Sequence, residues 1–84
     1  MKLIKFGAEW CGPCRMMNER LKNFNACEVQ YIDVDDESEE TQQLIGKYQI
    51  MNIPVMVLLD DQGNIVNRWN GLTDIKEIVN ACEQ

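Results

Sequence analysis

The amino-acid sequence predicts an α/β fold with the element order β-α-β-α-β-β-α, in which a four-stranded mixed sheet carries helices on both faces. Short segments rich in β-branched residues alternate along the chain with segments whose apolar residues recur every three or four positions. Residues 55–59 form a continuous apolar run, which is typical of a strand covered on both faces. A turn signal at residues 60–64 then leads into a further strand, so the last two strands are predicted to form a hairpin.

The first strand is predicted over residues 2–6, and residues 7–9 carry the chain out of it. From Cys11 onward the apolar spacing changes to three and four residues, which places those side chains on one face of a helix. Residues 28–34 are rich in β-branched side chains and predict the second strand. The apolar face of the first helix comprises Cys14, Met17, Leu21 and Phe24.

The acidic segment at residues 35–40 is interpreted as the solvated first turn of a second helix. Carboxylates and a serine suit the positive end of a helix dipole, and Gly46 indicates that this helix is short. The apolar side chains that follow the acidic segment are Leu44, Ile45 and Tyr48.

The chain ends in a strand over residues 65–69 and a last helix. Gly71 breaks the strand, and Thr73 is predicted to cap the helix. Because a helix joins the first two strands, these are expected to be parallel, whereas the hairpin adds antiparallel partners to the same sheet. The apolar face of the last helix comprises Ile75, Ile78, Val79 and Cys82.

The length of 84 residues predicts a single domain over residues 1–84 with one small core. A net charge of −6 with few, scattered Lys and Arg argues against nucleic acid or an anionic membrane surface as a partner. No apolar run approaches the roughly 20 residues of a membrane span, and the first cysteine comes too early for a secretory signal. We therefore expect a cytoplasmic monomer, in a compartment where unprotected thiols stay reduced.

Two cysteines with two residues between them, Cys11 and Cys14, stand at the start of the first predicted helix. The helix dipole and its unpaired N–H groups favour an anion there, so we expect the pKa of Cys11 below the free value of about 8.5. Cys14 follows one turn later on the inward face, at a separation that suits a disulfide. One sulfur is thus expected at the surface with the other behind it, the asymmetry that thiol–disulfide exchange needs. Gly12 permits close approach of a partner chain, and Pro13 is pre-set for a first helical turn.

Three chemical roles compete for this pair. A structural zinc site needs four ligands, but the other two cysteines stand alone and the chain has no histidine. A permanent disulfide is disfavoured by the expected reducing compartment and by the very short loop that it would close. A redox-active pair is the favoured interpretation, because Cys-x-x-Cys in a βαβ context is a redox signature.

The segment Trp10-Cys11-Gly12-Pro13-Cys14, followed about forty residues later by Ile53-Pro54 at the start of an apolar strand, resembles the thioredoxin family. The resemblance spans nearly the whole chain and implies a minimal thioredoxin-like fold, without the additional N-terminal strand and helix usual in the family. In length the chain resembles the short, glutaredoxin-sized thioredoxins. The Gly-Pro pair between the cysteines is typical of thioredoxins and differs from the Pro-Tyr or Pro-Phe of glutaredoxins.

The resemblance implies a role for each matching residue. Cys11 would be the nucleophile, Cys14 the resolving thiol and Pro54 a cis-proline that faces their disulfide. Ile53 would offer its backbone to an extended substrate segment, a form of strand addition. The apolar contact surface for the substrate would comprise Trp10, Gly12, Pro13, Ile53 and Gly71.

Two positions depart from the family pattern. Thioredoxins usually carry a buried Asp six residues before the first cysteine, where this chain has Lys5, and many carry a Lys where this chain has Tyr31. Lys5 can favour a thiolate through its charge, or act as a base if burial lowers its pKa, and both are forms of proton handling. The sequence slightly favours a simpler alternative, in which the stem of Lys5 covers the core while its ammonium group reaches solvent.

The resemblance implies a thioredoxin-type reductase of protein disulfides. No bound cofactor is expected, because the electrons are carried by the Cys11–Cys14 disulfide itself, and thioredoxin reductase or glutathione would restore the dithiol. One alternative is a glutathione-driven, glutaredoxin-like enzyme, against which stands the single glycine of Asn70-Gly71 after the hairpin. Another is a binding module that acts as a clamp on a larger enzyme, although a clamp would not need the intact cysteine pair.

Cys27 and Cys82 lie outside this motif. Cys82 falls on the apolar face of the last helix, where the default role is that of a small buried hydrophobic residue. Cys27 lies between the first helix and the second strand. In a thioredoxin-like layout these two helices share one face of the sheet, so a Cys27–Cys82 bridge is conceivable if their Cα atoms come within about 7 Å.

Overall fold

A computed structural model describes residues 1–84. Its strands and helices follow the predicted order β-α-β-α-β-β-α. None of the three helices has both the length and the apolar character needed to cross a membrane. The elements are β1 (Lys2–Gly7), α1 (Gly12–Arg20), β2 (Glu28–Asp33), α2 (Glu39–Lys47), β3 (Val55–Leu59), β4 (Ile65–Asn70) and α3 (Ile75–Cys82).

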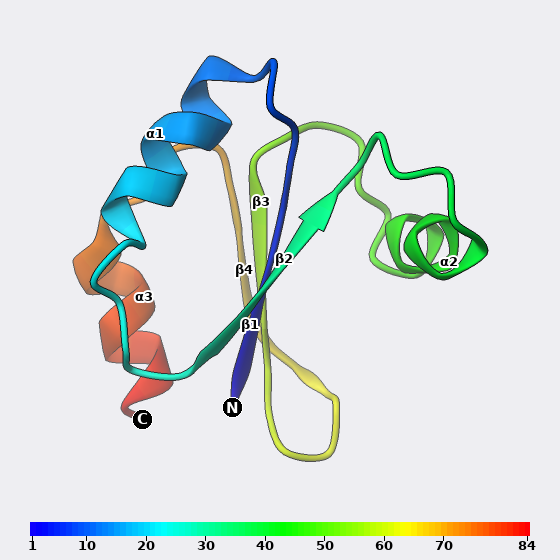
Figure 1. Cartoon of the computed structure of the whole chain (residues 1–84). Coiled ribbons are helices and arrows are strands. Elements are labelled where there is room, and N and C mark those ends of the chain that lie inside the picture. Colours follow the sequence, from blue (N-terminus) through cyan, green and yellow to red (C-terminus); the bar gives the residue numbers. More distant parts are fainter.

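The four strands form one mixed sheet in the order β2-β1-β3-β4. β1 and β2 are parallel, as expected for strands joined by a helix, whereas β3 is antiparallel to both β1 and β4. α1 and α3 cover one face of the sheet and α2 covers the other (Figure 1). The predicted mixed sheet with helices on both faces is therefore confirmed.

Apolar side chains fill both sides of the sheet, because successive residues of a strand point to opposite faces. Leu3 of β1 packs in a cluster with Met17 of α1 and Ile78 of α3. Its neighbour Ile4 belongs to a second cluster, together with Phe6, on the side covered by α2. All five residues of β3 are buried, which agrees with the continuous apolar run in the sequence.

Two predictions about helix ends are wrong. Phe24 lies beyond α1, which ends at Arg20, although the Phe24 ring still packs against the cluster beneath that helix. The last helix is capped by Asp74 instead of Thr73: the Asp74 carboxylate accepts a hydrogen bond from the backbone N–H of Lys76 at 3.0 Å. The Thr73 hydroxyl instead donates to the carbonyl oxygen of Gly71, and a carboxylate one residue closer to the helix suits its positive end better.

The acidic segment is exposed to solvent, as predicted, but only its last two residues, Glu39 and Glu40, lie in the first turn of α2. Ser38 is the N-cap, and its hydroxyl oxygen accepts a hydrogen bond from the backbone N–H of Thr41 at 3.3 Å. Just before it, the Asp36 carboxylate accepts hydrogen bonds from the N–H of Ser38 and the hydroxyl of Thr41, which lower the pKa of Asp36. The helix is short, with Gly46 in its last turn.

Candidate active site

The cysteine pair occupies the start of α1. Cys11 is the N-cap residue, and the backbone N–H of Cys14 donates a hydrogen bond to Sγ of Cys11 at 3.2 Å. Pro13 lies in the first turn, where its missing N–H costs no intrahelical bond. Cys11 and Cys14 are joined by a disulfide, with their Cα atoms 5.2 Å apart. One helical turn therefore brings the two sulfurs into bonding position.

Both cysteines of the disulfide are shielded from solvent. Cys14 is completely buried and Cys11 is only 6% exposed, so Cys11 is more buried than the predicted surface position. The cause is the packing of Ala8, Val34 and Ile53 around the pair, from segments that the helix pattern alone does not bring together. The predicted order of depth is retained, because Cys14 lies deeper than Cys11.

A loop that is distant in sequence completes the apolar surroundings. The half-buried Ile53 packs against the cysteine cluster, and the Ile53–Pro54 peptide bond is cis. The backbone N–H of Gly71 donates to the carbonyl oxygen of Pro54 at 2.7 Å, and Gly71 has φ +84°, a conformation that favours glycine. The structure thus brings Ile53 to the disulfide and ties Pro54 to Gly71.

Trp10 lies on the surface beside the disulfide. Its side chain is 68% exposed, and its indole N–H donates a hydrogen bond to the Asp35 carboxylate at 2.7 Å. Pro13 is exposed, and a side chain added at Gly12 would meet no atom within 4 Å. No local pattern distinguishes Asp35, because in a run of six acidic and capping residues nothing marks the one that reaches back to the tryptophan.

β1 carries a buried lysine beneath the active-site helix. The favoured prediction that Lys5 reaches solvent is wrong: Lys5 is 3% exposed, and its Nζ donates a hydrogen bond to the carbonyl oxygen of Cys14 at 3.2 Å. Strand alternation is the reason, since it turns Lys5 toward the same side of the sheet as Leu3, where α1 packs. Burial lowers the pKa of Lys5 from its ordinary value of 10.5.

Gly7 provides the space in which Lys5 and Cys14 approach each other. A Cβ atom at this position would lie 2.5 Å from Nζ of Lys5 and 3.3 Å from Sγ of Cys14. The amine and the inner sulfur are therefore less than about 6 Å apart. The sequence pattern places Gly7 only in the exit from the first strand, because a glycine does not reveal which side chains it admits.

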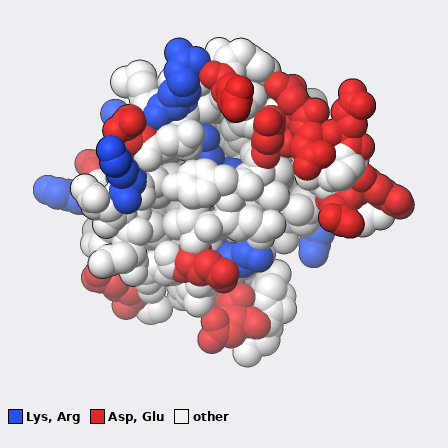
Figure 2. Space-filling model, viewed as in Figure 1, with Lys and Arg blue, Asp and Glu red and all other residues white.

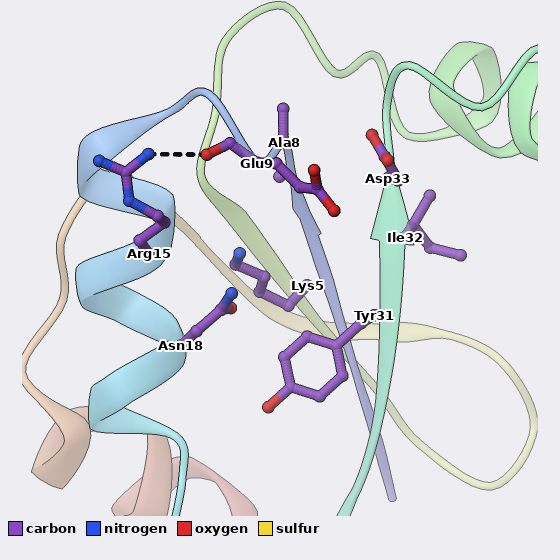
Figure 3. A pocket seen from close by; sticks show the side chains of 9 residues that line it. Lys5, Ala8, Glu9, Arg15, Asn18, Tyr31, Ile32 and Asp33 are labelled. Atoms are coloured by element: carbon purple, nitrogen blue, oxygen red, sulfur yellow. Dashed lines mark hydrogen bonds between the residues drawn. The ribbon is translucent and has the colours of Figure 1, made fainter.

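A pocket opens between α1 and the β1–β2 edge of the sheet. Its volume is about 540 Å³, and Lys5 contributes to its lining. Figure 3 shows the amine of Lys5 extending toward α1, with Asn18 and Tyr31 beside it. At the upper rim the Arg15 guanidinium donates to the carbonyl oxygen of Glu9 at 2.7 Å. The pocket gives water a route to an otherwise buried amine.

Acidic side chains border the active site on the α2 side. Figure 2 shows Asp and Glu gathered over α2 and the segment that leads to it, while Lys and Arg are fewer and scattered. The Trp10–Asp35 hydrogen bond connects the cysteine loop to this acidic segment. No group of three or more His, Cys, Asp or Glu side chains is arranged to hold a metal ion.

Known proteins are similar to this chain in sequence and in fold. The family model named Thioredoxin matches residues 1–84. A thioredoxin of Chlamydia pneumoniae is 37% identical over 98% of this chain and 79% of its own length. A prophage-derived thioredoxin-like protein of Bacillus subtilis is also 37% identical, over 84% of this chain and 82% of its own. The solved structure of a mutant thioredoxin from Halobacterium salinarum superimposes with a TM-score of 0.80 at 34% identity, and covers 98% of this chain and 71% of that one.

A disulfide between cysteines one helical turn apart is the oxidised half of a dithiol couple, so this site can take up and release two electrons. The depth of the two sulfurs agrees with that chemistry, because Cys14 is completely buried and lies beneath Cys11. With one family model matching it from end to end, the chain belongs to the thioredoxin family of thiol–disulfide oxidoreductases.

Proposed function

We propose that this protein reduces disulfide bonds in other proteins, as a cytoplasmic monomer. In its reduced form the Cys11 thiolate attacks one sulfur of the substrate disulfide, and the other substrate sulfur leaves as a thiolate. Cys14 then loses its proton and attacks Sγ of Cys11 in the mixed disulfide, which expels the second substrate sulfur. Two electrons pass to the substrate, the Cys11–Cys14 disulfide remains, and no bound cofactor takes part.

The proposal rests on the arrangement of the two sulfurs at the start of α1. The N–H of Cys14 donates to Sγ of Cys11 at 3.2 Å, and the same contact stabilises a thiolate there, because the first turn of a helix favours negative charge. Cys14 has no exposed surface, so a foreign disulfide meets Cys11 first. The inner sulfur then reacts only with the mixed disulfide, which gives the two cysteines separate roles.

The surface around Cys11 supports binding of an extended protein segment. Trp10 is largely exposed, Gly12 presents bare backbone, and Ile53 lies half-buried against the cysteine cluster. We expect the backbone of Ile53 to pair with the substrate chain by strand addition, next to Pro54. The apolar contacts with the substrate would come from Trp10, Gly12, Pro13, Ile53 and Gly71.

Thioredoxin reductase is the expected electron donor, because the Gly-Pro pair between the cysteines is the thioredoxin form of the motif. The test is insulin reduction with NADPH and thioredoxin reductase, compared with glutathione alone at matched reducing capacity. We expect turnover at least about tenfold faster with the reductase. Equal or faster turnover with glutathione alone would instead assign the protein to glutathione-driven reduction.

Lys5 is proposed to handle the proton of the resolving thiol. Its amine lies less than about 6 Å from Sγ of Cys14, and burial lowers its pKa, so an unprotonated amine is more available than on an exposed lysine. The neutral amine accepts the Cys14 proton, and the resulting ammonium lies beside the new thiolate. The adjoining pocket lets water return the proton to solvent.

The substitution Lys5→Met tests this role through the pH dependence of the resolving step. We expect release of substrate from the mixed disulfide to slow by about tenfold or more at neutral pH, and to recover at alkaline pH where Cys14 ionises unaided. The measurement is single-turnover release of the second substrate thiol across a pH series. Lys22→Met, at an exposed position after α1, is the matched control. A Lys5→Met profile that overlays the wild-type profile would remove Lys5 from the reaction.

The same variant gives an independent thermodynamic readout. Because folding lowers the pKa of Lys5, the unfolded chain binds more protons than the folded chain between that lowered value and 10.5. The free energy of unfolding of wild type relative to Lys5→Met should therefore rise with pH across this window, and be lowest below it. Urea denaturation at several pH values measures this difference.

A further inference from the structure

A second pair of cysteines meets away from the active site. Sγ of Cys27 and Sγ of Cys82 lie 3.2 Å apart, although the residues are 55 positions apart in sequence. Figure 1 shows the segment before β2 passing by the C-terminal end of α3, while the start of α1 lies at the other end of that helix layer. We propose that Cys27 and Cys82 form a second redox site, a dithiol that low-molecular-weight disulfides convert reversibly into a Cys27–Cys82 disulfide.

The geometry requires little movement. A disulfide bond is about 2.05 Å long, so the sulfurs must approach by a little more than about 1 Å. Cys27 immediately precedes β2, and Cys82 is the last residue of α3. Both cysteines therefore lie at the end of a strand or helix, where few backbone hydrogen bonds oppose a small shift. The bridge can form without unfolding the sheet or the helix.

The surroundings leave the pair reachable by a small oxidant. Both cysteines are partly exposed, and on their inner side they pack, as Phe24 and Val29 do, against the core cluster beneath α1 and α3. Burial first, and then the neighbouring Cys27, raise the pKa of Cys82 to about 12. Cys82 thus stays protonated near neutral pH, and attack on an oxidant begins at Cys27.

The reaction balances with a small disulfide such as oxidised glutathione as the acceptor. The Cys27 thiolate attacks one sulfur of the acceptor, which breaks the acceptor disulfide and releases one glutathione thiolate. Cys82 then loses its proton and attacks Sγ of Cys27, which expels the second glutathione. The two protein thiols are oxidised by two electrons, and one acceptor disulfide is reduced to two thiols. Excess reduced glutathione or dithiothreitol reverses both steps.

The bridge would change stability more than activity. It would connect the α1–β2 segment to the end of the chain and close a long loop, which restricts the unfolded state strongly. Cys11 and Cys14 take no part in it, so the Cys27–Cys82 state can change independently of the active-site state. The protein would then hold two dithiol couples in one small domain.

Thiol counting by mass spectrometry tests the proposal. The reduced wild-type protein is incubated with excess oxidised glutathione, denatured, and labelled with an alkylating agent. We expect no alkylated cysteine and no glutathione adduct, with peptide mapping that shows a 27–82 linkage. Two alkylated cysteines mapped to 27 and 82, or a stable glutathione adduct at either one, would overturn the proposal.

A variant that lacks the active-site thiols isolates the second pair. In Cys11→Ser/Cys14→Ser, oxidation should remove both remaining thiols without added mass from glutathione, and raise Tm by roughly 10 °C or more. Adding Cys27→Ser to that variant is the matched control: its lone Cys82 can only gain a glutathione adduct and cannot gain the Tm increase. An unchanged thiol count and an unchanged Tm in the double variant after oxidation would contradict the proposal, whatever thiol count the wild-type protein gives.

Discussion

Replacing Cys11 with serine will lower the rate of insulin disulfide reduction by more than about 10³-fold, to the uncatalysed level, because no other sulfur at the site can start the exchange. Cys14 is completely buried beneath Cys11, so its sulfur cannot reach a foreign disulfide and take over the attack. Replacing Cys14 with serine has a different expected result. Cys11 still attacks, but the resolving thiol is missing, and a mixed disulfide with one substrate molecule accumulates. Non-reducing electrophoresis and mass spectrometry with a model disulfide substrate distinguish the two outcomes.

The same pair of variants separates catalysis from simple binding. A protein that acts only as a clamp on a larger enzyme would keep its partner after either substitution, and its wild type would not reduce insulin. Equal activity of wild type and Cys11→Ser would therefore contradict the proposed reductase function. Met16→Ala, on the exposed side of α1, is a suitable control, because it leaves both sulfurs and their hydrogen bond in place.

Local patterns were sufficient to predict the fold. The alternation between strand and helix periodicity, together with the apolar run of β3, gave the element order and the mixed sheet. The wrong predictions about the fold concern the end of α1 and the start of α3, because a single hydrogen bond can decide where a helix begins or ends. At α3 two adjacent residues could both cap, and Asp74 does so in place of Thr73.

The active site was harder to predict wherever it depends on contacts between distant segments. Cys11 and Cys14 follow from a short motif, since their separation is one helical turn. The burial of Lys5 cannot be predicted from a motif, because it depends on α1 packing over β1. From the sequence alone, a lysine at this position can equally reach solvent. The Trp10–Asp35 hydrogen bond spans 25 positions and leaves no local signature.

Phe6 connects the stability of the fold to the position of the site. Its ring has no exposed surface, and it lies between Lys5 and Gly7 on β1, a central strand of the sheet. On the α2 side it packs with Tyr48, whose ring centroid is 6.1 Å away. The ring therefore helps to fix the strand end from which the cysteine loop and the lysine both project.

Phe6→Ala should lower the free energy of unfolding by about 3 to 5 kcal/mol, because it removes the buried ring and leaves a cavity that the sheet cannot close. That loss is a large part of the typical free energy of unfolding of a domain. In a domain of this size it would lower Tm by roughly 15 °C or more. Urea denaturation of the reduced protein measures it directly. Met51→Ala, at a side chain that is 90% exposed, is the control and should change stability by less than about 0.5 kcal/mol. A loss below about 1 kcal/mol for Phe6→Ala would mean that α2 and Tyr48 move in to fill the space, and that β1 is held chiefly by its backbone pairing with β2 and β3.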